Sequence, residues 1–273
     1  MPLLQLDSVS LSFFSHKGVE IGGAHTGNAN GVKVRRIIQL ISDFVSPQKE
    51  NVRILDVACG DGVYAIEAAL HGFDTVAFDA RSTRLAGGEQ CAERNNISNI
   101  QFLKKDLRSL HDIEGRFDAI LLLGILYHLT AEDVVKLLRD CVEKSNIVII
   151  DTHHSLGPDE TFISNEEVYH GTSFREHEPG DDEQVRYNRV GASFGNSVSF
   201  QYTKESLVRL LLGTGFTTVV ECLAPLEPGK PIDRVTLMAK KSEPVKLATY
   251  PWINGKNELE IDRAVKAWSE VQR

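Results

Sequence analysis

Long apolar runs are missing from this sequence, and no stretch of it is long enough to span a bilayer. The first residues, MPLLQLDSVSLSFF, lack the basic region and the cleavage site of a secretory signal. Internal repeats and low-complexity tracts are also absent. We therefore expect a cytoplasmic protein without a membrane span, and 273 residues allow one large α/β domain with additions.

Cysteine is scarce, and the few cysteines are scattered without the spacing of a zinc site. They are Cys59, Cys91, Cys141 and Cys222. This usage predicts no disulfide framework and fits a reducing compartment. Acids and histidines do lie close in sequence at Asp151, His153, His154, His170 and His177. Their spacing matches no standard metal signature, so no metal is predicted.

An excess of basic charge is also lacking, because the formal net charge is −8 at pH 7. The chain therefore has no global basic field of the kind that attracts nucleic acid. Small basic groups occur at residues 33–36 and 104–108, where a solvated face is the simpler interpretation. Nucleic acid is not expected as a partner.

What the sequence does contain is a strong local pattern at residues 52–79. A short β-branched apolar run, typical of a buried parallel strand, leads into a glycine loop and a helical stretch. A second strand then ends at Asp79. Glycines at the first turn let a ligand approach the helix N-terminus, and an acid at the second strand tip is placed for ribose hydroxyls. This βαβ unit predicts an adenosine-type cofactor.

The glycine pattern alone leaves two cofactor classes open, because Gly60-x-Gly62-x-x-Ala65 also fits the dinucleotide fingerprint. Asp56 lies inside the first strand, where an acid would crowd a pyrophosphate but suits a cationic, amino-acid-like ligand. The loop D-x-x-C-G-D-G resembles motif I of the class I S-adenosylmethionine (SAM)-dependent methyltransferases. This resemblance favours SAM over NAD.

The resemblance continues in family order over residues 51–241, with one interruption. The third strand is expected at residues 100–106. In the family the acid that ends it contacts the adenine amino group, and here that acid is Asp106, followed by the backbone amide of Leu107. The string LLGILYHL is similar to the LGVLYH signature of a subgroup with tRNA wobble-uridine-modifying transferases and many small-molecule relatives. The cofactor contacts that the resemblance implies are Asp56, Ala58, Gly60, Gly62, Asp79, Ala80, Arg81, Asp106, Leu107, Leu123 and Gly124.

The same resemblance implies a Rossmann-like fold: a seven-stranded, mostly parallel sheet with one reversed strand and helices on both faces. The closing antiparallel pair is expected at residues 217–223 and 234–239. Helices are expected at residues 32–45, 82–95 and 130–144 from their apolar spacing and from the family order. Thr130 and Thr203 are the expected N-caps of the helix at 130–144 and of the family's penultimate helix.

One long segment, residues 155–200, falls outside the family order and exceeds the usual loop length. It follows the fifth strand, which is expected at residues 146–151, and loops after such strand ends face the ligand crevice. Its several aromatic residues favour a substrate lid, with a surface excursion or dimer contact as the alternative. The predicted organisation is a leader and helix covering the site over residues 1–50, a methyltransferase domain over 51–241 with the insert 155–200, and a tail over 242–273 with a helix at 257–271.

Three histidines at strand ends are the candidate catalytic bases. SAM carries a reactive sulfonium methyl group, and a hydroxyl acceptor must lose a proton as it is methylated. His128 follows the fourth strand, and His153 and His154 follow the fifth. Side chains alternate at a strand end, and we favour His154 as the one that points into the crevice, with His128 next. Catalysis by positioning alone, or a base from the insert or the leader such as His170 or His25, stays open.

The acceptor is the least determined part of the prediction. An acidic chain with an aromatic insert fits a small-molecule hydroxyl, for example on a sugar or secondary metabolite, and an amine comes second. A tRNA wobble-uridine-modifying transferase, favoured by a basic stripe beside the pocket, stays open, as does a carboxylated SAM. A non-catalytic SAM-binding subunit, favoured by a filled pocket, also stays open. Homo-oligomerisation is not decided.

Overall fold

The structure is a computed structural model that describes residues 13–14, 19–21, 31–45, 51–227 and 229–249. Most of the predicted leader, including His25, and the predicted tail helix at 257–271 lie outside the described residues. Within the leader, β1 (Phe13–Phe14) and β2 (Glu20–Ile21) form an antiparallel pair. None of the described helices is both long and apolar enough to cross a bilayer.

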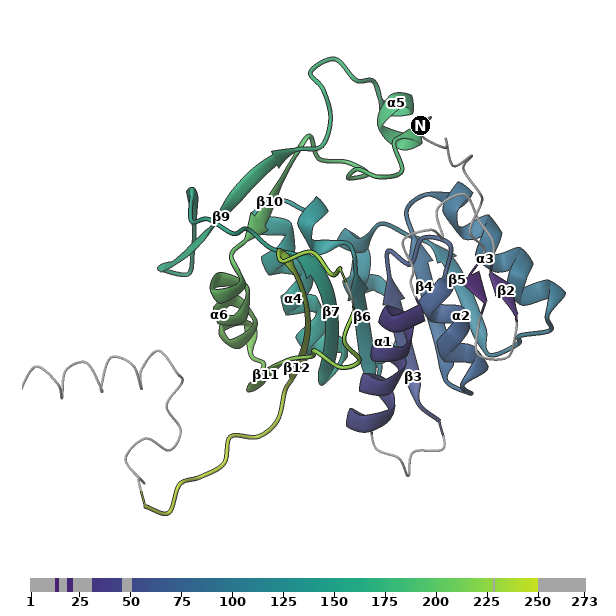
Figure 1. The fold of residues 1–273 in the computed structure, drawn as a ribbon, viewed down its shortest axis with the longest axis horizontal. Coiled ribbons are helices and arrows are strands. Elements are labelled where there is room, and N and C mark those ends of the chain that lie inside the picture. The colour runs from purple at the N-terminus through teal and green to yellow at the C-terminus, as the bar shows by residue number, and fades with distance from the viewer. Residues whose placement is uncertain (1–12, 15–18, 22–30, 46–50, 228, 250–273) are drawn as a thin grey trace, which may run out of the picture.

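A seven-stranded sheet forms the centre of the molecule, in the order β11-β12-β7-β6-β3-β4-β5 (Figure 1). Its strands are β3 (Arg53–Val57), β4 (Asp74–Asp79), β5 (Ile100–Lys104), β6 (Ala119–Leu123), β7 (Ile147–His153), β11 (Thr218–Glu221) and β12 (Arg234–Lys240). β12 runs antiparallel to both of its neighbours, whereas the pairings from β7 through β5 are parallel. The predicted fold class, with its single reversed strand, is confirmed.

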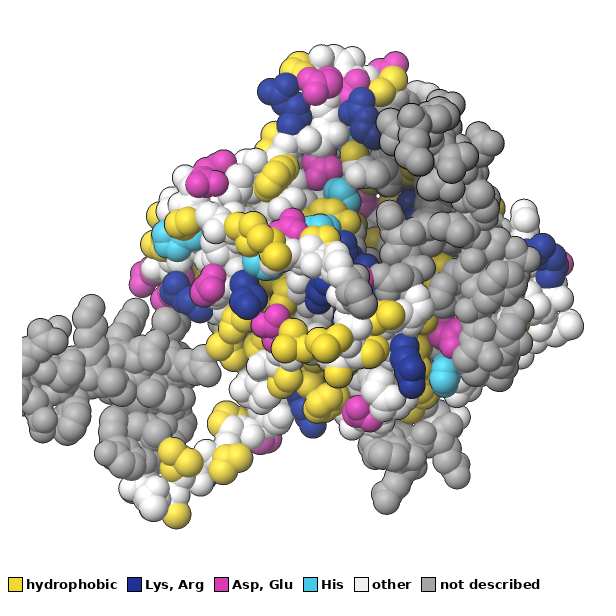
Figure 2. All heavy atoms as spheres, in the orientation of Figure 1, with side chains coloured by type: hydrophobic (Ala, Val, Ile, Leu, Met, Phe, Trp, Pro, Cys, Tyr) yellow, Lys and Arg dark blue, Asp and Glu magenta, His cyan; other side chains and the backbone are white. Residues whose placement is uncertain are grey.

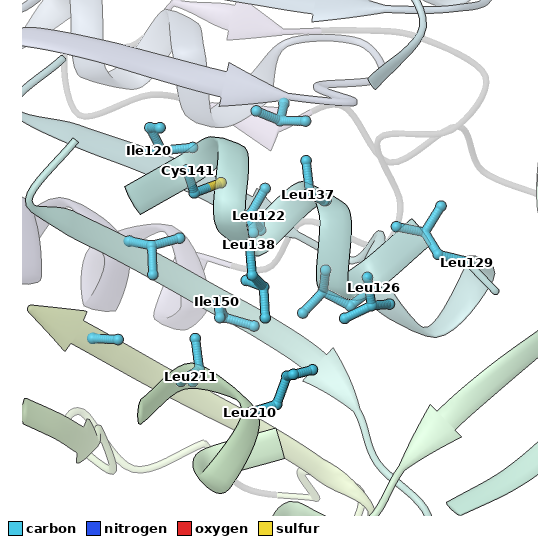
Figure 3. Close-up of a cluster of buried hydrophobic side chains, with 14 of the residues drawn as sticks. Ile120, Leu122, Leu126, Leu129, Leu137, Leu138, Cys141, Ile150, Leu210 and Leu211 are labelled. Carbon is cyan, nitrogen blue, oxygen red and sulfur yellow. The ribbon is translucent and has the colours of Figure 1, made fainter. Parts of the chain in front are cut away.

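Helices cover both faces of this sheet. They are α1 (Gly31–Phe44), α2 (Val63–Leu70), α3 (Ser82–Arg94), α4 (Ala131–Lys144) and α6 (Lys204–Thr214). Alternate strand residues enter two separate cores, so Ile54 packs with α1 and α2 while Leu55 packs with α4 and α6. Figure 3 shows Ile120 and Ile150 on the second face, beside Leu138 and Leu211. Burial on both faces explains why these strands are apolar throughout.

The ends of two helices follow from their capping residues. The Thr130 hydroxyl accepts a hydrogen bond from the Asp133 N–H at 3.1 Å, which starts α4. The Thr203 hydroxyl accepts one from the Ser206 N–H at 3.2 Å, which starts α6. α6 ends at Gly215, whose φ of 116° is a left-handed conformation that glycine adopts without strain. Both predicted N-caps are confirmed.

The insert after β7 is a folded unit, whereas its length suggested a long loop. It contains β8 (Glu160–Ser164), β9 (Glu167–Arg175) and α5 (Glu183–Asn188), and it leads into β10 (Val198–Tyr202). The three strands form an antiparallel sheet in the order β10-β9-β8. Figure 1 shows this sheet and α5 beyond the carboxyl ends of the central strands. Any lid function of the insert stays a prediction.

Two strand ends differ from the prediction in ways that matter for the site. The third strand was expected to run to Asp106, but β5 ends at Lys104, and Asp106 instead caps the 3₁₀ helix η2 (Leu107–Asp112). The fifth strand was expected to end at Asp151, but β7 continues through His153 because β12 pairs with it to that point.

Candidate functional site

A cavity of about 470 Å³ lies at the carboxyl ends of β3, β4, β6 and β7. This volume is within the range of about 300–1,000 Å³ that is common for small-ligand sites. The predicted cofactor residues that line it are Asp56, Ala58, Gly60, Asp79, Ala80, Arg81, Asp106, Leu107, Leu123 and Gly124. Gly62 does not line it, and faces Phe102, whose Cε1 atom a Cβ at this position would approach to 2.7 Å.

Asp79 is held in place by backbone donors from two different loops. The Gly60 N–H donates to Asp79 Oδ2 at 3.1 Å, and the Arg81 N–H donates to Asp79 Oδ1 at 2.9 Å. The loop after β3 reaches Asp79 through a left-handed turn, with φ values of 54° at Ala58 and 57° at Gly60. Each carboxylate oxygen can accept a second hydrogen bond, so Asp79 keeps acceptor capacity at the cavity wall.

Asp56 is a buried acid on the same wall. It is 1% exposed, and within the described part of the chain its Oδ2 atom has no hydrogen-bond partner. Burial, together with the nearby Asp79, raises the pKa of Asp56 to about 8. A cation placed beside this carboxyl would favour its ionised form.

Asp106 is fixed by Arg108, two residues further along the chain. Asp106 Oδ1 accepts the Arg108 N–H at 2.9 Å, and the Arg108 guanidinium lies 3.1 Å from Asp106 Oδ2. The same guanidinium donates to Asp133 at 3.0 Å and to Asn196 of the insert at 3.3 Å. The edge of the cavity at β5 is therefore connected to the insert.

The three candidate histidines do not share one environment. His128 and His153 line the cavity, and His154 does not. The Nδ1 of His154 donates to the Ser155 carbonyl at 3.0 Å. From the sequence, His154 was favoured over His153, whereas the structure places His153 at the cavity. Strand alternation allows one of the two to face the cavity, and the pairing of His153 with Arg234 of β12 sets which one does.

His153 has both ring nitrogens occupied. Its Nδ1 is 2.9 Å from Asp233 Oδ2, and its Nε2 is 2.9 Å from the Arg234 guanidinium. Because arginine only donates, Nε2 must accept, and the proton of the neutral ring then lies on Nδ1 and is donated to Asp233. In this arrangement His153 has no free nitrogen that could take a proton from a ligand.

His128 is paired with a buried acid of the insert. Its Nδ1 lies 3.0 Å from Oε2 of Glu176, which also accepts the Ser193 N–H at 2.7 Å. Burial raises the pKa of Glu176, but the bonds from His128 and Ser193 outweigh burial and lower it below its ordinary value. The ionised Glu176 therefore accepts the Nδ1 proton of His128. The Nε2 atom of His128 has no hydrogen-bond partner among the described residues and is left as an acceptor.

A buried charge cluster lies behind these histidines. Asp151 is fully buried, and its Oδ1 atom is 2.6 Å from Nε of Arg234 and 3.4 Å from Nζ of Lys33. Its Oδ2 accepts the Thr236 hydroxyl at 2.8 Å. Burial raises the pKa of Asp151, but Arg234 and Lys33 outweigh burial and lower it below the ordinary value. Lys33 and Arg234 both reach the cavity, and burial lowers the pKa of Lys33 although Asp151 acts in the opposite direction.

Sequence reasoning missed Glu176, Lys33 and Arg234. Lys33 was grouped with other basic residues as a solvated face, but it is 6% exposed on α1. A basic residue on the apolar side of a predicted helix is a signal that could have identified it. Glu176 and Arg234 gave no comparable signal, because their partners lie 48 and 83 residues away. Among the described residues, no group of three or more His, Cys, Asp or Glu side chains is placed to hold a metal ion.

Residues 54–144 match the model of a methyltransferase domain family. A Bacillus subtilis (strain 168) protein named "Putative methyltransferase YqeM" is 30% identical over 128 residues, 43% of this chain and 51% of the relative. The ubiquinone biosynthesis O-methyltransferase of Rickettsia akari (strain Hartford) is 24% identical over 151 residues, 55% of this chain and 58% of the relative. The chain thus spans about half the length of the curated relatives it matches.

A solved structure with a similar fold is the N-terminal domain of EvdMO1, crystallised in the presence of S-adenosylhomocysteine (SAH) and D-fucose. It is 21% identical, with a TM-score of 0.63 over 84% of this chain and 90% of that one. Residues 54–144 are therefore similar to a methyltransferase domain, and the fold is similar to that of the EvdMO1 domain.

Proposed function

We propose that this chain is a SAM-dependent methyltransferase that methylates a hydroxyl group of a small molecule, with His128 as the general base. The observation that carries the proposal is that His128 lines the same cavity as Asp79 and Asp106 and is paired with the buried Glu176 of the insert. A base and the predicted cofactor acids therefore border the same space.

In this proposal the cofactor is bound by the ends of three strands. Asp79 accepts hydrogen bonds from the ribose hydroxyls, and Asp106 with the Leu107 amide binds the adenine. Asp56 faces the positively charged amino group of the methionyl part, which suits a buried carboxyl with an unpaired oxygen. Bound SAM supplies an electrophilic methyl group on a sulfonium centre.

His128 removes the acceptor proton in this proposal. Glu176 holds the Nδ1 proton, which directs the basic Nε2 away from Glu176 and stabilises the positive charge that forms when Nε2 takes up a proton. Both ring nitrogens of His153 are engaged, one by Asp233 and one by Arg234. The role of His153 in this proposal is therefore to orient these two residues. Lys33 and Arg234 are further proposed contacts for a negatively charged group of the cofactor or acceptor.

The choice of a hydroxyl acceptor is supported by the base and by the relatives. A histidine held by a carboxylate is suited to deprotonating a hydroxyl near neutral pH. The Rickettsia relative is named as an O-methyltransferase, and the EvdMO1 domain was crystallised with D-fucose. We therefore propose a hydroxyl-bearing small molecule such as a sugar, with the insert as the lid over it.

The tRNA alternative gains no support from the arrangement of charge. Lys33 and Arg36 are buried on α1, and Arg108 is engaged by Asp106 and Asp133. Figure 2 shows basic and acidic side chains interspersed over the described part of one face, without a basic stripe. The open cavity likewise gives no support to a non-catalytic SAM-binding subunit.

The proposal is tested by incubating the protein with SAM and a panel of small molecules that carry sugar, phenolic or aliphatic hydroxyls, with SAH release as the readout. With an accepted substrate, His128→Ala should lower turnover by about 100-fold or more, the usual range for loss of a general base. His111→Ala is the matched control, because His111 is exposed and lies outside the cavity. Failure of the protein to bind SAM or SAH would refute the proposal, as would full turnover by His128→Ala.

A further inference from the structure

Part of the insert borders the cavity on the side where the cofactor acids lie. The consecutive residues Val190, Gly191, Ala192, Ser193 and Phe194 line the same cavity as Asp79 and Asp106. We call residues 189–194 the cover segment. A lid that only enclosed the acceptor would be expected near the histidines, whereas the cover segment also contacts Arg81, which follows β4. Figure 1 shows α5, which precedes this segment, beyond the carboxyl ends of the central strands.

Arg81 fastens the cover segment to the end of β4. Its Nε donates to the Tyr187 carbonyl at 2.9 Å, and its Nη2 lies 3.1 Å from the Ala192 carbonyl and 3.2 Å from that of Ser193. Nη2 also lies 3.3 Å from the Arg189 carbonyl. These carbonyls include those at the end of α5, which have no partner within the helix. The Arg81 guanidinium therefore holds the insert, although the sequence assigned it to the cofactor.

The same residue touches the predicted ribose acid through its backbone. The Arg81 N–H donates to Asp79, while the Arg81 side chain reaches the insert and lies 5.5 Å from the centre of the Phe194 ring. Arg81 is 7% exposed, and burial lowers its pKa although the nearby Asp79 acts in the opposite direction. A single residue thus connects the loop at Asp79 to the cover segment.

A second set of contacts ties the cover segment to the histidines. The Ser193 N–H donates to Glu176, the partner of His128, and the Ser193 carbonyl lies 2.8 Å from Nε2 of the buried His177. Ser193 therefore contacts Arg81 on one side and the His128–Glu176 pair on the other. Movement of the cover segment would disturb both the cofactor acids and the proposed base.

We propose that the cover segment forms the outer wall of the adenosine site and that Arg81 is the positioning residue that holds it there. This inference rests on the proposed function, because it takes Asp79 and Asp106 as the acids that bind the adenosine. Bound cofactor lies beneath residues 189–194, so it leaves only when the contacts of Arg81 with the insert break.

The test uses the full chain and SAH as the probe, with Arg81→Ala and Arg81→Lys. Arg81→Ala keeps the N–H bond to Asp79 but removes the contacts with the insert. SAH should then dissociate at least about tenfold faster, because several charge-assisted hydrogen bonds are lost. Hydrogen exchange of residues 189–194 should speed up, and in the wild type SAH should slow it. Arg175→Ala is the matched control, because Arg175 lies on the insert but is exposed and outside the cavity.

Lysine keeps the positive charge but cannot contact the separate carbonyls at once, so Arg81→Lys should also release SAH faster than the wild type. If Arg81→Ala does not fold, the result with Arg81→Lys decides the question. SAH dissociation within twofold of the wild type would overturn the inference. So would weakened SAH binding with unchanged exchange in residues 189–194, since Arg81 would then contact the cofactor directly. No SAH binding by the wild type would instead refute the proposed function itself.

Discussion

The cavity has two walls that are built in different ways. The cofactor wall, which consists of Asp56, Gly60, Asp79 and Asp106, uses short loops at strand ends and backbone N–H groups as supports. The histidine wall, which consists of His128, His153 and Arg234 with Glu176 as the partner of His128, uses side chains that pair across 48 and 81 residues. The cover segment contacts both walls, but a single side-chain substitution that leaves this segment in place should affect either cofactor binding or proton removal, and so different measurements.

The largest expected effect is on the charge cluster behind the histidine wall. Asp151→Asn leaves Lys33 and Arg234 buried without their shared counter-charge, which should lower the free energy of unfolding by about 3–5 kcal/mol in urea denaturation. The matched control is Asp74→Asn, because Asp74 pairs with Arg53 at the surface and should contribute less than about 1 kcal/mol. A similar small loss for both variants would contradict the role given to this cluster.

The sign of the pH effect at Asp151 follows from its lowered pKa. The stabilisation is present above the ordinary aspartate value of about 4 and is lost as the pH falls below it. The wild type should therefore lose more stability than Asp151→Asn on acidification below about pH 4.

On the cofactor wall, the largest effect should come from Asp79→Ala. It removes the proposed ribose contacts and leaves the N–H groups of Gly60 and Arg81 without their acceptor. SAH affinity measured by calorimetry should weaken by about 2–3 kcal/mol, or about 30- to 150-fold. Asp112→Ala, at an exposed acid of η2, should bind SAH as the wild type does. If Asp79→Ala also did so, the cofactor would lie elsewhere.

On the histidine wall, Glu176→Gln should lower turnover by about tenfold at saturating SAM. Glutamine fills the same space but lacks the charge that stabilises a protonated His128, which corresponds to about 1.4 kcal/mol in the barrier. SAH affinity should stay within about twofold, and the exposed Glu178→Gln should match the wild type in both assays. A variant that lost SAH affinity but kept its turnover would show that the two walls are not separable in this way.

The smallest effect is the pH dependence of cofactor binding at Asp56. With a pKa of about 8, about a tenth of Asp56 is ionised at pH 7 and half at pH 8. If the positively charged amino group of the cofactor binds the ionised form of Asp56, the apparent Kd for SAH should fall about fivefold between these pH values. Asp56→Asn should lack this pH dependence. An equal pH dependence in Asp56→Asn would assign it to another group.

The same raised pKa makes a prediction for stability. The folded protein keeps a proton on Asp56 that the unfolded chain releases near pH 4, so stability from this group is lost as the pH rises from about 4 to 8. Thermal unfolding should show that Asp56→Asn loses less stability than the wild type across this window.

The cofactor wall was predictable because its signals are local. The apolar run, the glycine turn and the acid at a strand end lie within residues 52–79, and strand order then brings Asp106 to the same edge. Of the predicted cofactor residues only Gly62 is placed away from the cavity, since this N-cap residue of α2 faces Phe102.

The histidine wall was only partly predictable. Contacts between segments far apart in the sequence determine which of its side chains face the cavity and which residues they pair with. Alternation required one of His153 and His154 to face inward, but the pairing of β7 with β12 determined that it is His153. The partner of His128 comes from the end of β9, in an insert whose sheet the sequence did not predict. No spacing rule connects residue 128 to residue 176.

A crystal structure of the protein with bound SAH would test the two-wall account most directly. The account predicts ribose oxygens within hydrogen-bond distance of Asp79, the adenine beside Asp106 and Leu107, and the sulfur directed at the part of the cavity lined by Tyr127 and His128. Electron density for SAH with the ribose away from Asp79, or with the sulfur directed away from His128, would contradict it.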